Sequence, residues 1–190
     1  AGNVALNLAA MKAKVSCIGV IGNDNWGKEL ISLLDGNIDV SNIIISEPLT
    51  TTLKQRTYLQ GKQILRVDEE EQLDSSYDIK VNSLVNDILY KFDIIILSDY
   101  NKGLLNKNTI THILNIANKH NIPVIVDPKK SNFSYYNGAN ILTPNLNELS
   151  KASKITITDD ESIIKSCQNL IKDNRFKYIV TTKGENGMII

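Results

Sequence analysis

The residues best suited to chemistry in this chain lie in two short segments, each of which follows an apolar run. The Asp-Pro-Lys segment at residues 127–129 follows the run at 124–126, and residues 143–148 follow Ile141 and Leu142. Because open α/β sheets bind ligands at the carboxyl ends of their strands, we expect both segments at one binding edge. Their carboxylates, lysine and amides suit phosphate and a divalent ion. This combination points to phosphoryl transfer.

Asn145 and Glu148 have the spacing of a helix start. A helix that begins there would present backbone N–H groups and the positive end of its dipole to a phosphate. Glu148 could then hold Mg²⁺, directly or through water. The spacing alone leaves an alternative equally open, in which Asn145 only caps a helix and Glu148 is solvated.

Three other polar turns have simpler explanations. Asp99 and Lys102 follow an expected strand, where a substrate would be held, but taken alone they are better explained as a charge pair in an ordinary loop. The glycine turn at 19–27 lacks dinucleotide-binding spacing, which favours a tight strand-to-helix turn, although Asp24 could reach a sugar hydroxyl. The polar segment at 182–187 is by default a hairpin turn.

The elements that must position these residues alternate between strands and helices. The pattern predicts strands at 15–21, 93–97, 123–126 and 178–181, and helices at 4–10, 77–89, 106–120 and from about 158 onward. Residues 51–68 are different, because alternating residues flank a Gln-Gly-Lys turn and predict a hairpin apart from the main sheet. The expected fold class is α/β, a three-layer domain with a mostly parallel sheet and a β hairpin.

The bulk properties exclude several classes of protein. The length of 190 residues fits one domain. Lys plus Arg and Asp plus Glu are equal at 21 each, so no strong field attracts nucleic acid or a membrane. Cys17 and Cys167 are expected to be buried thiols of a reducing, cytoplasmic protein. Both ends are expected to be cut, since the chain starts inside a glycine turn and stops in an apolar strand.

Taken together, several segments resemble the PfkB, or ribokinase-like, carbohydrate kinases, and most closely their heptose 7-phosphate kinase branch. They follow one another along almost the whole chain: AGNVALNLA (1–9), IGVIGNDNWG (18–27), QILRVD (63–68), LSDYNKGLL (97–105), VDPKKSNFSYYNGANILTPNLNEL (126–149) and TTKGENGM (181–188). The resemblance implies a ribokinase-like kinase domain over residues 1–190, partial at both ends, with residues 51–68 as its lid.

The resemblance also implies a reaction. ATP would phosphorylate D-glycero-β-D-manno-heptose 7-phosphate at its anomeric hydroxyl, with Mg²⁺ and without a covalent enzyme intermediate. The product, the 1,7-bisphosphate, would serve ADP-heptose synthesis for the lipopolysaccharide core. The family further implies a homodimer joined through the lid and, in many relatives, fusion to an adenylyltransferase domain.

The implied site residues fall into two groups. ATP would contact Asn145, Leu146, Asn147, Glu148, Thr182 and Gly184, with Glu148 at the metal. The sugar phosphate would contact Asn3, Lys54, Arg56, Gln63, Arg66, Asp99, Lys102, Asp127 and Lys129. The family's catalytic base is an aspartate in a downstream Gly-Ala-Gly-Asp segment, which residues 1–190 do not contain. No catalytic residue is therefore assigned, and we expect the 190-residue chain alone to be inactive.

Two alternatives remain at this point. One is another sugar or nucleoside kinase of the same fold, which would not depend on the 7-phosphate. The other is a non-catalytic phosphosugar-binding module, which the absence of the downstream aspartate would favour.

Overall fold

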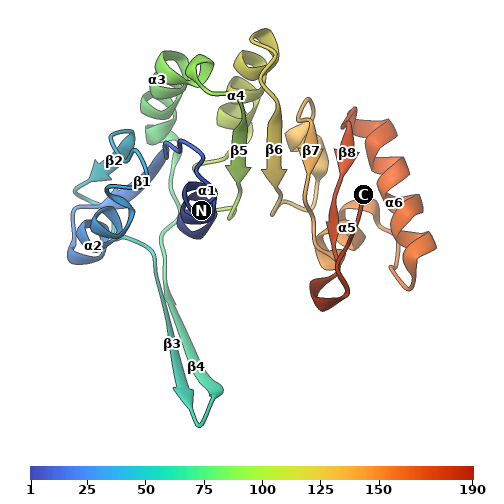
Figure 1. Ribbon diagram of the computed structural model, residues 1–190, viewed down its shortest axis with the longest axis horizontal. Helices are drawn as coiled ribbons and strands as arrows, with labels where there is room; N and C mark the ends of the chain where they lie inside the picture. Colours follow the sequence, from blue (N-terminus) through green and yellow to red (C-terminus); the bar gives the residue numbers. More distant parts are fainter. The chain divides into compact units, whose positions relative to one another are not determined.

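The computed structural model describes residues 1–190 and divides them into two compact units, residues 1–73 and residues 74–190. Each unit has its own parallel sheet (Figure 1). The assignment of residues 1–190 to a single kinase domain stays a prediction. No helix in either unit combines the length and the apolar character needed to cross a membrane.

The first unit starts with a small α/β motif. It comprises α1 (Gly2–Ala10), β1 (Gly19–Gly22), α2 (Asn25–Leu34) and β2 (Ile43–Ser46), and β1 pairs with β2 in parallel. Its core is formed by the buried residues Ala5, Leu34 and Ile38, against which flanking apolar side chains pack. The expected strand at 15–21 starts only at Gly19, because Ser16 makes a single isolated bridge to Asp39.

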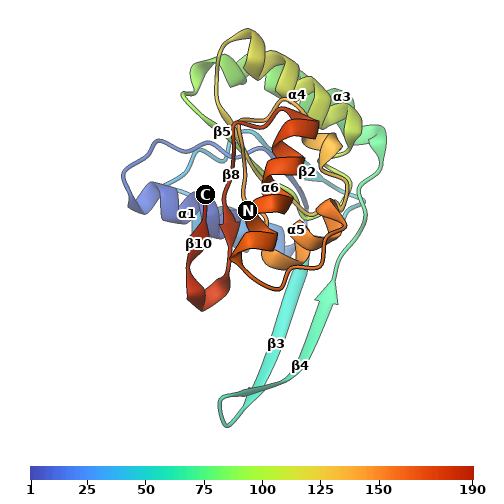
Figure 2. The ribbon, with the colours of Figure 1, turned by 90° about the vertical axis from the view of Figure 1, so that its right-hand side faces the viewer.

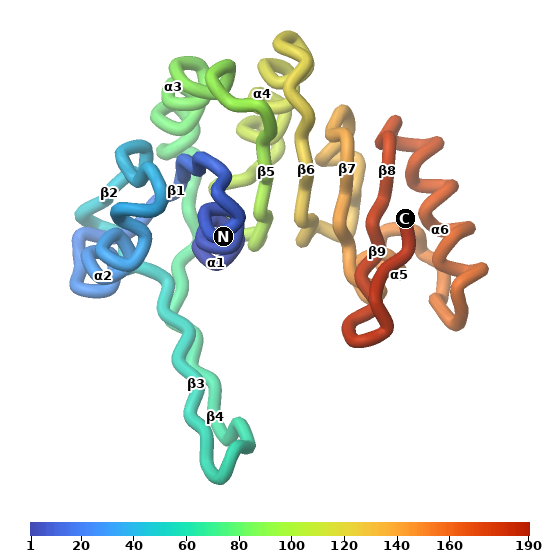
Figure 3. Tube along the Cα trace, viewed as in Figure 1, coloured from blue at the N-terminus to red at the C-terminus, as the bar shows by residue number.

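A long hairpin completes the first unit. Strands β3 (Leu53–Leu59) and β4 (Lys62–Glu69) pair antiparallel, which confirms the predicted hairpin as an element. Gln60 and Gly61 form the turn with φ of 50° and 78°, as a two-residue type I′ turn requires. Figure 3 shows the hairpin extending as a two-stranded ribbon away from β1 and β2, and all of β4 is exposed.

The second unit is built on a four-stranded parallel sheet. Its strands β5 (Ile95–Ser98), β6 (Val124–Asp127), β7 (Ile141–Leu142) and β8 (Tyr178–Ile179) lie in the order β5-β6-β7-β8. Parallel neighbours need crossover connections, which helices supply here. Helix α4 (Lys107–Lys119) lies between β5 and β6, η3 (Phe133–Tyr136) lies between β6 and β7, and α5 (Leu146–Ser153) and α6 (Asp160–Asn174) lie between β7 and β8. The elements η1 (Ser75–Tyr77), α3 (Asp78–Ile88) and η2 (Leu89–Lys91) precede β5.

The core of this unit confirms the predicted helical pattern. Ile110, Ile113, Leu114 and Ala117 share one face of α4 and are all buried. Helices α3 and α4 lie side by side in Figure 2 and are in contact. The central strands β6 and β7 contribute fully buried residues to the same core. The mostly parallel α/β fold class is therefore confirmed.

The chain after β8 turns back on itself. Strands β9 (Thr181–Thr182) and β10 (Met188–Ile189) pair antiparallel around the short helix η4 (Gly184–Asn186). The polar segment at 182–187 is thus a turn between two strands, as its composition predicted.

Candidate functional site

The carboxyl edge of the β5–β8 sheet brings the predicted polar loops together. The Asp99 amide donates to the Asp127 carbonyl at 3.0 Å, which joins the loops after β5 and β6. The Thr182 amide donates to the Pro144 carbonyl at 3.0 Å, which joins the segments after β7 and β8. Parallel strands end at the same edge, so segments that are far apart in sequence become neighbours here.

The start of α5 is closed by a reciprocal cap. Asn145 Oδ1 accepts from the Glu148 amide at 2.9 Å, and Glu148 Oε2 accepts from the Asn145 amide at 3.1 Å. The capping role that the spacing left open is therefore present. Leu146 and Asn147 form the first turn behind this cap, where helix N–H groups have no partner within the helix.

Glu148 also faces the loop after β6. Its second oxygen, Oε1, accepts from Lys129 Nζ at 3.2 Å. The Lys129 side chain is 56% exposed whereas that of Glu148 is 14% exposed, so the lysine can turn toward a ligand while the carboxylate stays in place. One carboxylate thus organises both its own helix and an exposed cation.

Asp127 lies in the same cluster. The pKa of its carboxyl is raised, first because surrounding protein atoms desolvate the group and then because the Glu148 carboxylate repels its charge. The residue as a whole is exposed, so this desolvation is local to the carboxyl group. Two carboxylates that repel each other favour a bound cation between or beside them.

The donor set fits magnesium better than a metal that needs a closed protein cage. No group of three or more His, Cys, Asp or Glu side chains is arranged to hold a metal ion. Mg²⁺ keeps several waters and is usually held by one or two carboxylates plus substrate phosphates. Glu148, with Asp127 as its neighbour, meets that requirement.

Asp99 is held by a buried network that the sequence did not reveal. Its Oδ2 accepts from the Tyr136 hydroxyl at 2.6 Å and from Lys130 Nζ at 3.0 Å, and its Oδ1 accepts from the Asn101 amide at 2.6 Å. Burial and the Asp99 carboxylate raise the pKa of Tyr136, so its hydroxyl stays protonated and donates. Lys130 could have been noticed as the second lysine of the Asp-Pro-Lys-Lys run, but Tyr136 lies 37 residues from Asp99.

The remaining predicted residues of this unit lie in the flanking loops. Lys102 is partly buried in the bends after β5. Thr182 bridges to Asn145, and Gly184 opens η4 with φ of 61°. Thr182 and Asn145 are thereby brought together, and their binding of one ligand stays a prediction.

The hairpin gathers its four predicted residues on one face. Lys54 pairs with Asp68, Arg56 with Arg66 and Tyr58 with Gln63, so these side chains point to the same side. A register shift between Thr57 and Tyr58 makes this arrangement, because strict alternation would put Gln63 and Arg66 on opposite faces. Asn3, the remaining predicted contact, is exposed in α1.

Asp68 fixes two of the hairpin cations. Arg66 donates to it twice, with Nε to Oδ1 at 2.7 Å and Nη2 to Oδ2 at 2.8 Å. Lys54 Nζ lies 3.1 Å from Asp68 Oδ2 and 2.9 Å from Glu70 Oε2. The hydrogen bonds from Arg66 are the main reason why the pKa of Asp68 is lowered to about 2.

Asp24 has a structural role at the base of the hairpin. Its two oxygens accept from the Gly27 and Thr51 amides, each at 2.7 Å. A side chain at Gly22 would place its Cβ 2.2 Å from the Leu49 carbonyl oxygen, so the turn requires glycine. The favoured interpretation, a tight strand-to-helix turn, is confirmed.

An open parallel sheet with polar loops gathered at its carboxyl edge defines the class of α/β folds that bind their ligands at that edge. The model of the pfkB family of carbohydrate kinases matches residues 1–190, and the chain belongs to that family. The bifunctional protein HldE of Sulfurimonas denitrificans is 42% identical over all of this chain and 40% of its own length. The chain thus spans about two fifths of the curated relatives it matches.

Solved structures agree on the fold. The crystal structure of Sa239 superposes with a TM-score of 0.84 at 19% identity, over 98% of this chain and 61% of that one. Phosphofructokinase-2 from Escherichia coli in complex with potassium gives 0.74 at 22% identity, over 95% of this chain and 59% of its own. These likenesses establish a ribokinase-like α/β fold.

Proposed function

We propose that this chain is the kinase part of a protein that phosphorylates D-glycero-β-D-manno-heptose 7-phosphate with ATP. The C1 hydroxyl oxygen attacks the γ-phosphorus, the bond to the β,γ-bridging oxygen breaks, and ADP leaves. The product is the 1,7-bisphosphate, used in ADP-heptose synthesis for the lipopolysaccharide core. The observation that carries the proposal is the Lys129–Glu148 ion pair with the Asp127 carboxyl in its electrostatic field, in a chain that shares 42% identity with HldE.

In this proposal the edge of the β5–β8 sheet binds the nucleotide. The first turn of α5, at Leu146 and Asn147, offers N–H groups to phosphate, while Thr182 and Gly184 contact the nucleotide from the neighbouring turn. Glu148 would hold Mg²⁺ directly or through water, and the bound ion would neutralise the charge that spreads over the transferred phosphate. Asn145 keeps the start of α5 in place.

The sugar phosphate is bound by two sets of residues. Asp99, Lys102, Asp127 and Lys129 come from the sheet edge, where Lys129 faces both substrates and adds positive charge beside the phosphate that ATP transfers to the sugar. Asn3 and the hairpin face of Lys54, Arg56, Gln63 and Arg66 complete the set. The hairpin is the lid, which excludes water that would compete as acceptor.

The proposed reaction also needs a general base, and the protein is proposed to form a dimer and to carry a second domain. The proton of the attacking hydroxyl passes to a general base, which the family resemblance places in a Gly-Ala-Gly-Asp segment. The other hairpin face exposes Leu65 and Val67, which supports a homodimer joined through the lid. We place this dimer in the cytoplasm. The relatives are named bifunctional, which supports fusion to an adenylyltransferase domain.

The test is ADP release by the purified protein that carries this sequence, with Mg-ATP and four separate acceptors. We expect turnover with heptose 7-phosphate and not with unphosphorylated heptose, ribose or fructose 6-phosphate. Lys129→Met should lower kcat/KM by about 10²-fold, since it removes one charge that stabilises the transition state. Lys151→Met, on the exposed side of α5, is the matched control and should change little.

Turnover with one of the other sugars would keep the kinase and replace the substrate. Absence of ADP release with every acceptor, from a folded protein, would overturn the proposed function.

A further inference from the structure

The Tyr136 hydroxyl lies where two loops of the sheet edge meet, and neither the family match nor the proposed function uses it. Tyr136 ends η3, is fully buried and donates to Asp99 Oδ2 at 2.6 Å. The Tyr136 hydroxyl oxygen also accepts from the backbone amides of Lys129 and Lys130, both at 3.3 Å. One hydroxyl therefore ties the loop after β5 to the loop after β6.

Asp99, which accepts the hydrogen bond from the Tyr136 hydroxyl, is itself held in place by other contacts. Asp99 is 4% exposed and also accepts from Lys130 Nζ and the Asn101 amide. A carboxylate has about four acceptor positions, and three of them are filled here. Asp99 is thus an anchored point from which Tyr136 reaches the Lys129 backbone.

The anchored Tyr136 hydroxyl restrains the backbone of Lys129. Its backbone is bound to Tyr136 while its largely exposed side chain reaches Glu148 Oε1 at 3.2 Å. Lys130, its neighbour, points instead to Asp99 and lies 5.8 Å from the ring centroid of Tyr135. The direction of each lysine depends on the backbone between them, which is where the Tyr136 contacts fall.

We propose that Tyr136 is a positioning residue for phosphate transfer: its hydroxyl, anchored by Asp99, fixes the Lys129 backbone so that the Lys129 ammonium is directed to Glu148 and the nucleotide phosphate. This role rests on the proposed function of the sheet edge. A buried hydroxyl that only completes its hydrogen bonds would have no such role. A positioning hydroxyl changes nucleotide affinity through Lys129.

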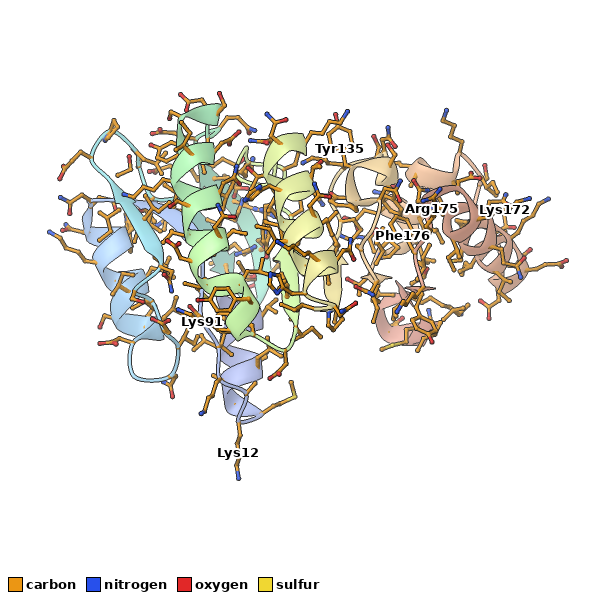
Figure 4. The ribbon with its side chains drawn as sticks, turned by 90° about the horizontal axis from the view of Figure 1, so that it is seen from above. Lys12, Lys91, Tyr135, Lys172, Arg175 and Phe176 are labelled. Carbon is orange, nitrogen blue, oxygen red and sulfur yellow. The ribbon has the colours of Figure 1, made fainter.

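Tyr136→Phe keeps the buried ring and removes only the hydroxyl. Tyr135→Phe is the matched control, because that neighbouring tyrosine, labelled in Figure 4, makes a ring contact with Lys130 that phenylalanine preserves. We expect Tyr136→Phe to weaken Mg-ATP affinity about tenfold, the effect of losing a hydrogen-bonded anchor, and Tyr135→Phe to change it less than about twofold. Hydrogen exchange at the amides of residues 129 and 130 should become about tenfold faster in Tyr136→Phe.

A double-mutant cycle with Lys129→Met separates positioning from general stability. In the Lys129→Met protein, Tyr136→Phe should weaken Mg-ATP binding by less than about twofold, because the side chain it orients is gone. Tenfold losses in both backgrounds, or unchanged amide exchange, would overturn the positioning role. An unmodified protein that binds no Mg-ATP would instead overturn the proposed function, while the exchange measurement would still report whether Tyr136 fixes the loop.

Discussion

The sheet edge and the hairpin both centre on an aspartate that accepts from a lysine and a second donor, yet the two regions differ in how firmly they hold it. The Asp99 side chain is 1% exposed and that of its partner Lys130 is 14% exposed. The Asp68 side chain is 27% exposed, and Arg66 is 44% exposed. The edge is organised before any ligand arrives, whereas the hairpin cations are held by contacts that water can replace.

This difference suits the two proposed roles. Phosphoryl transfer depends on groups fixed in place around the charge that develops in the transition state. A lid must open and close, so its contacts should be individually weak. The same pairing of charges therefore serves rigidity in one region and adjustment in the other, and three substitution experiments test that contrast.

The largest expected effect comes from removing the charge of each aspartate in turn. Asp99→Asn should lower the free energy of unfolding by about 3–5 kcal/mol, because it leaves the Lys130 ammonium buried without its carboxylate. Asp68→Asn should cost much less, as is usual for exposed ion pairs. Urea denaturation of the two variants measures both values, and equal losses would contradict the contrast.

An intermediate effect is expected at the start of α5. Asn145→Ala should cost about 1 kcal/mol, since it removes the side-chain oxygen that accepts from the Glu148 amide. Asn147→Ala is the matched control within the same exposed turn and should change stability by less than about 0.5 kcal/mol. Thermal unfolding distinguishes them, and a smaller loss at residue 145 than at 147 would show that the cap does not hold this edge.

The smallest effects are in titration, where the two regions should differ in sign. The pKa of Asp68 lies at about 2, below its ordinary value, so the carboxylate's contribution to stability is present above that ordinary value and is lost as the pH falls toward 2. The pKa of Asp127 is raised, so the folded chain binds its proton more tightly and stability falls as the pH rises between the unfolded and folded values.

Carboxyl-detected NMR titration measures both groups directly. Arg66→Gln should move the pKa of Asp68 back up, because the hydrogen bonds that lower it most are removed. Glu148→Gln should move the pKa of Asp127 down, because the repelling charge is gone. A shift of Asp68 after Glu148→Gln would show that the assigned causes are wrong.

The sequence predicts the framework well because its signals are local. The apolar face of α4, the hairpin turn at Gln60 and Gly61, and the polar loops after β5, β6 and β7 all follow from short-range patterns. Strand bounds were less accurate, since β1 starts at Gly19 rather than at residue 15. The hairpin residues could be named from the family resemblance, although their common face depends on a register shift that alternation does not predict.

The parts that sequence could not predict depend on long-range packing. Tyr136 meets Asp99 across 37 residues, and nothing in the local pattern of η3 indicates that contact. Lys129 and Lys130 are adjacent and chemically identical, yet one turns to Glu148 and the other to Asp99. Their separate partners follow from the backbone direction at the end of β6, which only the folded sheet determines.

The most direct test of the central claim, that the edge of the β5–β8 sheet is the nucleotide site, is to map Mg-ATP on the amide NMR spectrum of the protein that carries this sequence. The account predicts that the largest shifts fall at residues 129, 145–148 and 182–184. It also predicts that Lys129→Met reduces them at the same nucleotide concentration. Shifts that fall elsewhere in residues 74–190 while these amides stay unchanged would contradict it.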